Sequence, residues 1–406
     1  FNVVMGGSSA LGEAHMKKDF YSTNLTNLIE LTARNIKLVH TFSGGLRIQK
    51  IKNFFKNIFA SNTKSKSLKY ISKHYDLGNS FFSQWLDKSL TYSSAVYQNP
   101  NDSLEQAQQN KYQKLIDLLE VKDGDKVLEI GCGWGGFSEY FAKNYNVTID
   151  CITISKKQFE FTKNRINDAG LNNKVNVMFL DYRDLKEKYD RIASIEMIEA
   201  VGEKYLNKYF EIIKKSLNKN GSAAIQGITI RDELFERYRS SEDFIQKYIF
   251  PGGFLPSLSF MKSLIKKNNL GLLKVNSYSN DYAKTLAIWR ENFLKAWSNI
   301  APLGFDETFK KMWEFYLSYC EAGFKSKNID LIQFSMSNKQ VKVMKKIFGI
   351  FILLILTGCA NKMKPIDFKD QKPRLVIENY LSGNVKAWGV LQNRSGKVTR
   401  QFKADL

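Results

Sequence analysis

The sequence is poor in the residues that form metal sites and disulfide scaffolds. Among 406 residues there are three histidines, at positions 15, 40 and 74, too few for a histidine-rich metal site, and we expect no metal. The four cysteines, at positions 132, 151, 320 and 359, are scattered and form no Cys-x-x-Cys pair. This spacing argues against a structural zinc site and a disulfide framework. The main body of the chain is therefore expected to be a reduced, cytoplasmic protein.

Acidic residues are in the minority. The chain has 61 Lys and Arg against 40 Asp and Glu, which leaves a net charge of +21. A protein this basic is attracted to polyanions, either nucleic acid or an anionic bilayer. The chain lacks the Asn/Asp-Pro-Pro-Tyr/Phe type of motif that amino-methylating enzymes use on flipped bases. We therefore expect no nucleic-acid partner.

A glycine-rich turn organises the centre of the chain, in the stretch KVLEIGCGWGGF at 126–137. The pattern predicts a buried strand over Lys126–Ile130, a turn over Gly131–Gly136, and then a helix. The glycines leave the backbone bare, so that a ligand can approach to main-chain distance in front of a positive helix N-terminus. Glu129, near the strand end, can accept hydrogen bonds. A tight strand–helix turn without a ligand would also need glycine, so the surrounding sequence has to decide.

Strands and helices alternate around this turn. Strands are expected at 126–130, 147–154, 175–181, 189–196 and 222–230, and helices at 104–119, from Ser155 through 164, and at 208–217. This rhythm predicts an α/β fold with a parallel, doubly wound, Rossmann-like sheet. Ligands of such sheets bind beyond the carboxyl ends of the strands.

Flanking segments have a different character. Residues 1–64 include a helical pattern at 25–31 and a basic, aromatic stretch at 47–59, which is either a solvated helix face or a face that lies on an anionic membrane. A linker is expected at 61–67. The aromatic-rich stretch 70–97 is expected to be helix packed over the mouth of the next domain, and 244–257 an inserted lid.

The segment from 340 to 406 resembles a separate protein. Residues 344–359 have a basic start, ten residues that are apolar except for Gly349, and the ending Leu-Thr-Gly-Cys. The apolar run is too short to span a bilayer, has the layout of a secretory signal, and resembles a bacterial lipoprotein signal with Cys359 as the lipidated residue. A buried core helix is the alternative. We expect a gene fusion or read-through here, with one strand at 385–391 in a polar remnant that weakly resembles a lipoprotein family of unknown function.

The ligand of the glycine turn is predicted to be a nucleoside without a pyrophosphate. No Gly-Lys-Ser/Thr follows the glycines, which excludes a P-loop, and no acidic residue ends the second strand, as dinucleotide binding requires. S-adenosylmethionine fits this pattern, with its adenine near Ile154 and Tyr182, its ribose near Thr153 and Gln158, and its sulfonium near Gly131 and Tyr92. The full predicted cofactor set is Tyr92, Ser93, Glu129, Gly131, Gly133, Gly135, Thr153, Ile154, Gln158, Asp181, Tyr182 and Arg183.

Nine stretches, in order from about Tyr70 to Phe334, resemble cyclopropane-fatty-acyl-phospholipid synthases. They are HYDLGNSFFSQWLDKSLTYSSAVY, LEQAQQNKYQKLIDLL, VLEIGCGWGGFSEYFAKNY, ITISKKQ, DYRDL, YDRIASIEMIEAVG, FIQKYIFPGGFLPS, DYAKTLAIW and MWEFYLSYCEAGF. The resemblance implies a class I methyltransferase domain over 65–339 with an aromatic-rich helical lid. LGEAHM near the start resembles the end of the family's N-terminal domain, so 1–64 is expected to be a remnant of that domain with a linker.

The resemblance also implies a reaction. S-adenosylmethionine would methylate the cis double bond of a phospholipid acyl chain, and the carbocation would lose a proton to a bound bicarbonate as the ring closes. The residues that hold this anion map to Glu199 and Tyr282. A family histidine is replaced by Gln226, with Ile228 two residues further on, and the usual cysteine by Ser94. Cys320 aligns with a cysteine often assigned to the active site. These departures leave the identity of the base open.

Other functions stay open beside this one. A related enzyme would make a methyl branch instead of a ring, or methylate a small amine, and a degenerate core would serve only as a lipid-binding scaffold. The expected partners are membrane phospholipids at an anionic bilayer surface, with the enzyme cytoplasmic and peripheral at the inner face of the membrane. A homodimer is compatible with this interpretation.

Overall fold

The computed structural model describes residues 2–36, 77–338, 386–392 and 398–405. The chain divides into two compact units, Phe1–Val341 and Lys342–Leu406. The predicted basic face at 47–59, the linker at 61–67 and the signal-like segment at 344–359 lie outside the described residues. Among the described residues, no helix combines the length and the apolar character that crossing a bilayer requires.

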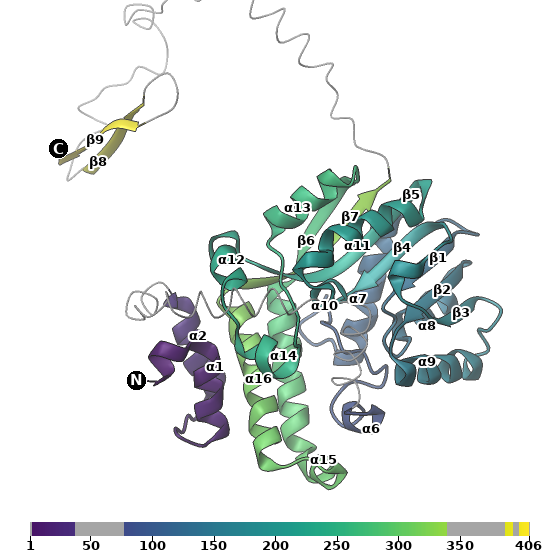
Figure 1. The fold of residues 1–406 in the computed structure, drawn as a ribbon, viewed down its shortest axis with the longest axis horizontal. Coiled ribbons are helices and arrows are strands. Elements are labelled where there is room, and N and C mark those ends of the chain that lie inside the picture. Colours follow the sequence, from purple (N-terminus) through teal and green to yellow (C-terminus); the bar gives the residue numbers. More distant parts are fainter. Residues whose placement is uncertain (1, 37–76, 339–385, 393–397, 406) are drawn as a thin grey trace, which may run out of the picture. The chain divides into compact units, whose positions relative to one another are not determined.

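A seven-stranded sheet with the order β3-β2-β1-β4-β5-β7-β6 forms the centre of the first unit (Figure 1). Its strands are β1 (Lys126–Ile130), β2 (Thr148–Thr153), β3 (Val175–Phe179), β4 (Tyr189–Ile195), β5 (Leu217–Ile230), β6 (Gly271–Ser277) and β7 (Ile329–Ser337). Strands β1 to β5 pair in parallel, whereas β7 is antiparallel to β5 and β6. The strand order reverses between β1 and β4, so their carboxyl ends flank the crevice where such sheets bind ligands.

Helices cover both faces of this sheet. The helices are α1 (Asn2–Met16), α2 (Leu25–Arg34), α6 (Asn79–Phe82), α7 (Leu104–Leu119), α8 (Gly136–Asn144), α9 (Lys156–Asp168), α10 (Ile198–Val201), α11 (Glu203–Ser216), α12 (Asp232–Arg239), α13 (Leu258–Lys267), α14 (Ser279–Lys295), α15 (Trp297–Ile300) and α16 (Glu307–Lys325), with the short turns η1 (Tyr182–Asp184), η2 (Ile245–Ile249) and η3 (Ala301–Leu303). Successive strand residues enter different cores, because strand side chains alternate between faces. Leu128 joins the core under α11 and α13, and Val127 joins the core under α7 and α8.

A second layer of helices stands beyond the carboxyl ends of the strands. Helices α14 and α16 run side by side, and α1 and α2 lie against α16 (Figure 1). His15 of α1 pairs with Glu314 at 3.2 Å, and Thr26 of α2 donates to Glu321 at 3.1 Å. An aromatic core that includes Trp85, Trp289 and Trp313 fills the space between these elements. The aromatic-rich stretches of the sequence therefore build a wall beside the ligand edge of the sheet.

The structure confirms the doubly wound α/β fold and corrects several local predictions. Among the described residues of the stretch 70–97, only the four-residue α6 is helical, and the rest is loop. Helix α11 begins at Glu203 instead of residue 208, directly after Gly202, whose φ of +75° ends the preceding short helix. The antiparallel strands β6 and β7 were not predicted.

Strand β5 begins at Leu217 instead of residue 222, because the Asn-Gly pair at 220–221 does not form a turn ahead of the strand. The pair sits inside the strand, at a register shift between β4 and β5. A Cβ on Gly221 would stand 3.0 Å from the carbonyl oxygen of Asp190. Glycine therefore serves a close backbone approach at a bulge here, where the sequence suggested a strand start.

The second unit contains a two-stranded antiparallel hairpin of β8 (Lys386–Gln392) and β9 (Val398–Asp405). The strand predicted at 385–391 corresponds to β8. Strand β9 was not predicted.

Candidate active site

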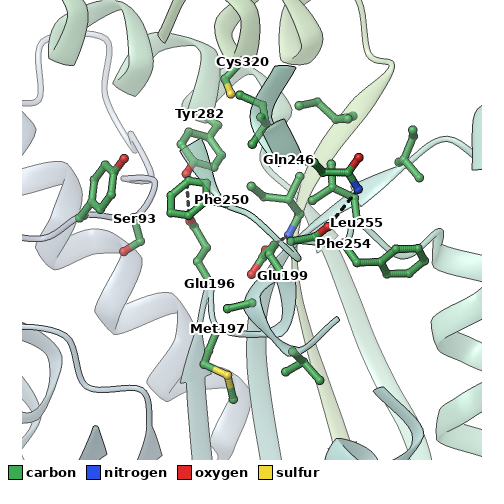
Figure 2. A pocket seen from close by; sticks show the side chains of 18 of the residues that line it. Ser93, Glu196, Met197, Glu199, Gln246, Phe250, Phe254, Leu255, Tyr282 and Cys320 are labelled. Atoms are coloured by element: carbon green, nitrogen blue, oxygen red, sulfur yellow. Dashed lines mark hydrogen bonds between the residues drawn. The ribbon is translucent and has the colours of Figure 1, made fainter. Parts of the chain in front are cut away.

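A single cavity of about 880 Å³ spans the carboxyl ends of β1 to β4 and reaches the helices beyond them. One half is lined by the glycine turn and the ends of β2 and β3. The other half is lined by aromatic side chains of α14, α16 and the η2 region. Figure 2 shows the junction of the two halves, where Glu196, Met197 and Glu199 lie below Tyr282 and Phe250. Most residues predicted for the site line this cavity; Gly135, Ser94 and Gln226 do not.

The glycine turn leaves open space where the cofactor is expected. Gly131 and Gly133 have φ of +83° and +54°, in the region that favours glycine. A Cβ on Gly133 would meet nothing within 4 Å, so the space over it is open to a ligand. A Cβ on Gly135 would stand 2.5 Å from the side chain of Thr162. Gly135 therefore allows α8 and α9 to pack closely, a role different from the predicted cofactor contact.

The end of β2 presents polar side chains held by local hydrogen bonds. The Thr153 hydroxyl donates to Gln158 Oε1 at 3.1 Å and accepts the Ser155 amide at 3.1 Å. Ser155 caps α9 as predicted, because its side chain accepts the amide of Gln158. Thr153, Ile154 and Gln158 all line the cavity. The predicted adenosine-binding edge is thus brought together without a carboxylate at the strand end.

Two predicted cofactor residues bind each other. Asp181 accepts hydrogen bonds from the backbone and the guanidinium of Arg183, at 2.6 to 2.9 Å, and this pairing raises the pKa of the arginine. The guanidinium lies 5.6 Å from the ring centroid of Tyr182. Burial raises the pKa of the Tyr182 phenol above its ordinary value, so the ring is a neutral face on the cavity. The ion pair positions this ring.

Glu129 at the end of β1 is buried and linked to α8. Its carboxylate accepts the Ser138 hydroxyl, and burial raises its pKa to about 7. A buried lysine that is absent from the predicted set lies near it. Lys111 of α7 donates to the Ser93 hydroxyl at 2.8 Å, and burial lowers its pKa to about 7. The sequence does indicate the burial of Lys111, because this residue lies on the apolar side of the helix, four residues from both Ala107 and Leu115.

The aromatic half of the cavity is built from rings that hold one another in place. The hydroxyls of Tyr92 and Tyr316 are 2.7 Å apart, and the Tyr282 ring stacks on Phe324 with centroids 4.4 Å apart. Such faces can stabilise a developing cation and exclude water. Cys320 lines this half, but burial and nearby carboxylates raise the pKa of its thiol well above the ordinary value. The thiol is therefore neutral, and we expect no nucleophilic role for it.

A carboxylate absent from the predicted set lies where the two halves meet. Glu196 follows β4 and accepts three hydrogen bonds: from the Tyr282 hydroxyl at 2.5 Å, the Gln226 side-chain amide at 2.8 Å and the Ser94 backbone amide at 2.8 Å. Tyr282 and Gln226 were predicted to act together with Glu199, yet they contact Glu196. The Ser94 hydroxyl, expected as a donor to an anion, donates instead to the Ala95 carbonyl.

Glu199 is less well satisfied than Glu196. Its Oε1 accepts the backbone amide of Ile228 at 2.5 Å, while its buried Oε2 has no hydrogen-bond partner. Burial, followed by the charge of Glu196, raises the pKa of Glu199 to about 8. When two carboxyl groups interact this closely, one stays protonated while the other carries the charge. Glu196, with its three donors, is the better place for that charge.

Gln226 is oriented by a residue that the sequence reading also missed. Gln333 of β7 lies opposite Gln226 of β5, and its side-chain amide donates to Gln226 Oε1 at 2.9 Å. This bond turns the NH₂ group of Gln226 toward Glu196. Only the antiparallel pairing of β5 and β7 brings the two glutamines together, so no local sequence signal pointed to the contact.

A doubly wound parallel sheet, a glycine turn after β1 and a cavity across the switch point are common to nucleotide-binding enzymes, and the uncharged polar end of β2 is the pattern of an S-adenosylmethionine-dependent methyltransferase. The family model described as mycolic acid cyclopropane synthetase matches residues 62–334. The chain belongs to this family. A second model, of a protein family of unknown function (DUF3833), matches residues 353–406.

Curated proteins and solved structures agree with this assignment. The chain is 35% identical over 339 residues to a tuberculostearic acid methyltransferase of Mycobacterium tuberculosis, covering 81% of this chain and 79% of that protein. It is 35% identical over 336 residues to the cyclopropane-fatty-acyl-phospholipid synthase of Escherichia coli K12, covering 82% and 83%. A solved cyclopropane synthase from Mycobacterium tuberculosis superposes with a TM-score of 0.63 at 26% identity, covering 66% of this chain and 98% of that one. A solved mycolic acid cyclopropane synthase complexed with SAH and CTAB superposes with a TM-score of 0.63 at 27% identity. The match covers 66% of this chain and 98% of that one.

Proposed function

We propose that this enzyme transfers the methyl carbon of S-adenosylmethionine to the cis double bond of unsaturated phospholipid acyl chains and closes a cyclopropane ring. The observation that carries the proposal is the single cavity, which joins a glycine-lined end to an aromatic-lined end with a carboxylate pair between them. The aromatic wall suits an alkene, which offers no charge for recognition.

The chemistry sets clear demands on the residues. S-adenosylmethionine supplies the carbon: its sulfonium–methyl bond breaks, the electron pair stays on sulfur, and the alkene π pair forms the first new C–C bond. The acyl chain now has a positively charged carbon and must lose a proton from the transferred methyl group. The electron pair of the broken C–H bond closes the ring. Alignment of a weak nucleophile supplies much of the acceleration. The rings of Tyr92, Tyr282 and Tyr316 can shield the cation from water.

Bicarbonate, which the family resemblance implies as the proton acceptor, fits the described residues poorly. Its expected donors on Tyr282 and Gln226 are engaged by Glu196. Glu199 is the remaining residue expected to hold the bicarbonate. Its pKa is raised by burial and by the charge of Glu196. A bound bicarbonate would have to displace Glu196 from its donors and add a negative charge beside two carboxyl groups.

The proposed substrate implies a place of action. Phospholipid acyl chains are reached at a bilayer surface, and a chain with a net charge of +21 is attracted to anionic lipid. We therefore infer a cytoplasmic enzyme that binds the inner face of the membrane peripherally, as a monomer or a homodimer.

A branched product is the second candidate: a methylene branch, which becomes a methyl branch only when a separate reductase supplies a hydride. The 35% identity to a tuberculostearic acid methyltransferase favours it as much as the E. coli relative favours the ring. The two outcomes share every step up to the cation. Loss of the proton without ring closure would leave a methylene alkene of the same mass as the cyclopropane.

Expression of the full chain in a bacterium that has unsaturated phospholipids but no cyclopropane synthase tests the proposal. We expect acyl chains heavier by one CH₂, and proton NMR of the purified fatty esters should show cyclopropane signals and no new olefinic signals. Olefinic signals from a =CH₂ branch on the acyl chain would establish the second candidate. Unmodified acyl chains in cells that contain folded enzyme would contradict both.

A further inference from the structure

We propose that the carboxylate of Glu196 is itself the base that removes the proton from the methylated acyl chain, in the position that the family resemblance assigns to bicarbonate. This inference rests on the proposed function and deepens it. The protein thus carries its own proton acceptor as a side chain instead of borrowing one from solution.

Three hydrogen bonds hold the carboxylate of Glu196. Its donors are the hydroxyl of Tyr282 to Oε2, and the amides of Gln226 and Ser94 to Oε1. Tyr282, Gln226 and Ser94 occupy the positions of three anion-binding residues in the resemblance. The groups expected to hold an anion therefore do hold one, and that anion is covalently part of the chain.

The backbone of Glu196 points the same way. Its φ is +48°, in the left-handed region that non-glycine residues rarely adopt. Such outliers persist when the surroundings over-determine them and gather at functional sites. Here the conformation carries the side chain from the end of β4 toward Tyr282 on α14, as Figure 2 shows. A residue selected only for the turn would be glycine, as at Gly131 and Gly133 on the neighbouring strand end.

Glu196 also lies between the two substrates. The next residue, Met197, packs on the glycine turn, since a Cβ on Gly131 would stand 2.9 Å from Met197 Cγ. Glu196 lines the same cavity as Gly131 on one side and Tyr282 and Phe250 on the other. A carboxylate has about four lone-pair directions, and three are occupied by the donors above. The fourth remains for a proton from the cavity.

Neighbouring charges favour Glu196 over Glu199 as the ionised member. Burial raises the pKa of Glu196 above its ordinary value, while its three donors and the charge of Lys111 act against that rise. Glu199 has one backbone donor and an unpartnered oxygen. We therefore expect Glu196 to carry the negative charge while Glu199 stays protonated. With Lys111 nearby, this arrangement limits the net charge of the buried side chains.

The step is balanced. A C–H bond of the transferred methyl group breaks, its electron pair forms the second C–C bond of the ring, and the proton is taken up by an oxygen of Glu196. The carboxyl group, neutral while the products leave, loses its proton to solvent before the next cycle. Oxidants, reductants and added anions are not required.

Two independent measurements test this role with the purified full chain, S-adenosylmethionine and vesicles of unsaturated phosphatidylglycerol. In the first, Glu196→Gln is compared with wild type, and Glu187→Gln, an exposed glutamate with a 70% accessible side chain, serves as the matched control. We expect Glu196→Gln to form product at least about 10²-fold more slowly while its Kd for S-adenosylmethionine stays within about twofold. Glu187→Gln should match wild type. Near-normal turnover by Glu196→Gln would overturn the proposal.

The second measurement uses wild type alone and so does not depend on the variant folding. The rate is recorded in buffer freed of carbon dioxide and again after bicarbonate is added. An unchanged rate supports Glu196 as the acceptor; a large fall that bicarbonate restores overturns it. Failure of the proposed function is distinguishable, because wild type would then add no CH₂ to the lipid under any condition.

Discussion

The hydroxyl of Tyr282 on α14 donates to Glu196, which follows β4, across 2.5 Å. This bond joins the helical wall to the sheet edge at the centre of the cavity. The tyrosine is buried, and its pKa is held well above the ordinary value by burial and by Glu196, so it acts as a donor and not as a base. Its removal should therefore affect the carboxylate more than the fold.

Tyr282→Phe tests this relationship. The ring keeps its stacking on Phe324, but Glu196 loses one of three donors. We expect kcat to fall by roughly 10- to 100-fold, because an acid–base group loses its positioning partner. The Kd for S-adenosylmethionine, measured by calorimetry, should stay near the wild-type value. Unchanged kcat, or an effect mainly on cofactor affinity, would contradict the role of this bond.

Gly133→Val should abolish the binding of S-adenosylmethionine. Its side chain would occupy the open space over the turn, at a φ of +54°. Gly170→Val is the matched control, because Gly170 has a φ of +66°, also meets open space and does not line the cavity. Both variants should lose stability by roughly 1–2 kcal/mol from backbone strain. Only Gly133→Val should lose cofactor affinity in calorimetry, and equal affinity in the two folded variants would argue against a cofactor at this turn.

The raised pKa of Glu199 predicts how stability depends on pH. The folded protein holds this proton up to about pH 8, whereas the ordinary pKa is 4.5. The wild type therefore has the full contribution of this group below pH 4.5 and loses it as the pH rises toward 8. Glu199→Gln cannot lose that proton. Relative to wild type, its free energy of unfolding should rise by roughly 1–3 kcal/mol between pH 5 and 8.

Denaturant titrations of both proteins at the two pH values measure this difference. A constant difference would show that Glu199 is not protonated in the folded state. The same reasoning gives an activity ranking: near pH 7 glutamine imitates the neutral acid, so Glu199→Gln should retain more turnover than Glu196→Gln. The reverse ranking would exchange the roles of the two residues.

The enzyme unit should work without the C-terminal unit. The boundary between the two compact units lies between residues 341 and 342. One family model matches residues 62–334 in the first unit, and another matches residues 353–406 in the second. A chain ending at residue 339 should keep its kcat and its melting temperature within experimental error. Lost activity in a folded truncated protein would show that the tail takes part in the reaction.

Sequence patterns predicted the parts of the site that local chemistry determines. The strand–glycine–helix unit at 126–144 and the Ser155 cap follow from residue types that are close together in the chain, and the structure reproduces them. Resemblance supplied Tyr282, Gln226 and Glu199 as an anion-binding set, and in the structure Tyr282 and Gln226 donate hydrogen bonds to Glu196. Glu196 was missed because a single acidic residue after a strand has no periodic signal, and its three donors come from positions 94, 226 and 282.

The remaining misses have the same origin. Gln333 reaches Gln226 only through the antiparallel pairing of β7, which a reading of parallel βα units did not include. Lys111 lies on the apolar side of its helix, but its hydrogen-bond partner Ser93 lies in an irregular loop, so the sequence pattern does not indicate their contact. Long-range pairing and loop geometry are decided by the packed structure and leave little trace in neighbouring residues.

The most direct test follows the carbon. Purified full-length enzyme is incubated with S-adenosylmethionine labelled with ¹³C at the sulfonium methyl group and with vesicles of unsaturated phosphatidylglycerol, and the acyl chains are analysed by carbon NMR. Label in the CH₂ of a cyclopropane ring, one per modified double bond, is the predicted result. Label that never enters the acyl chain, with folded enzyme that binds the cofactor, would contradict methylene transfer to lipid.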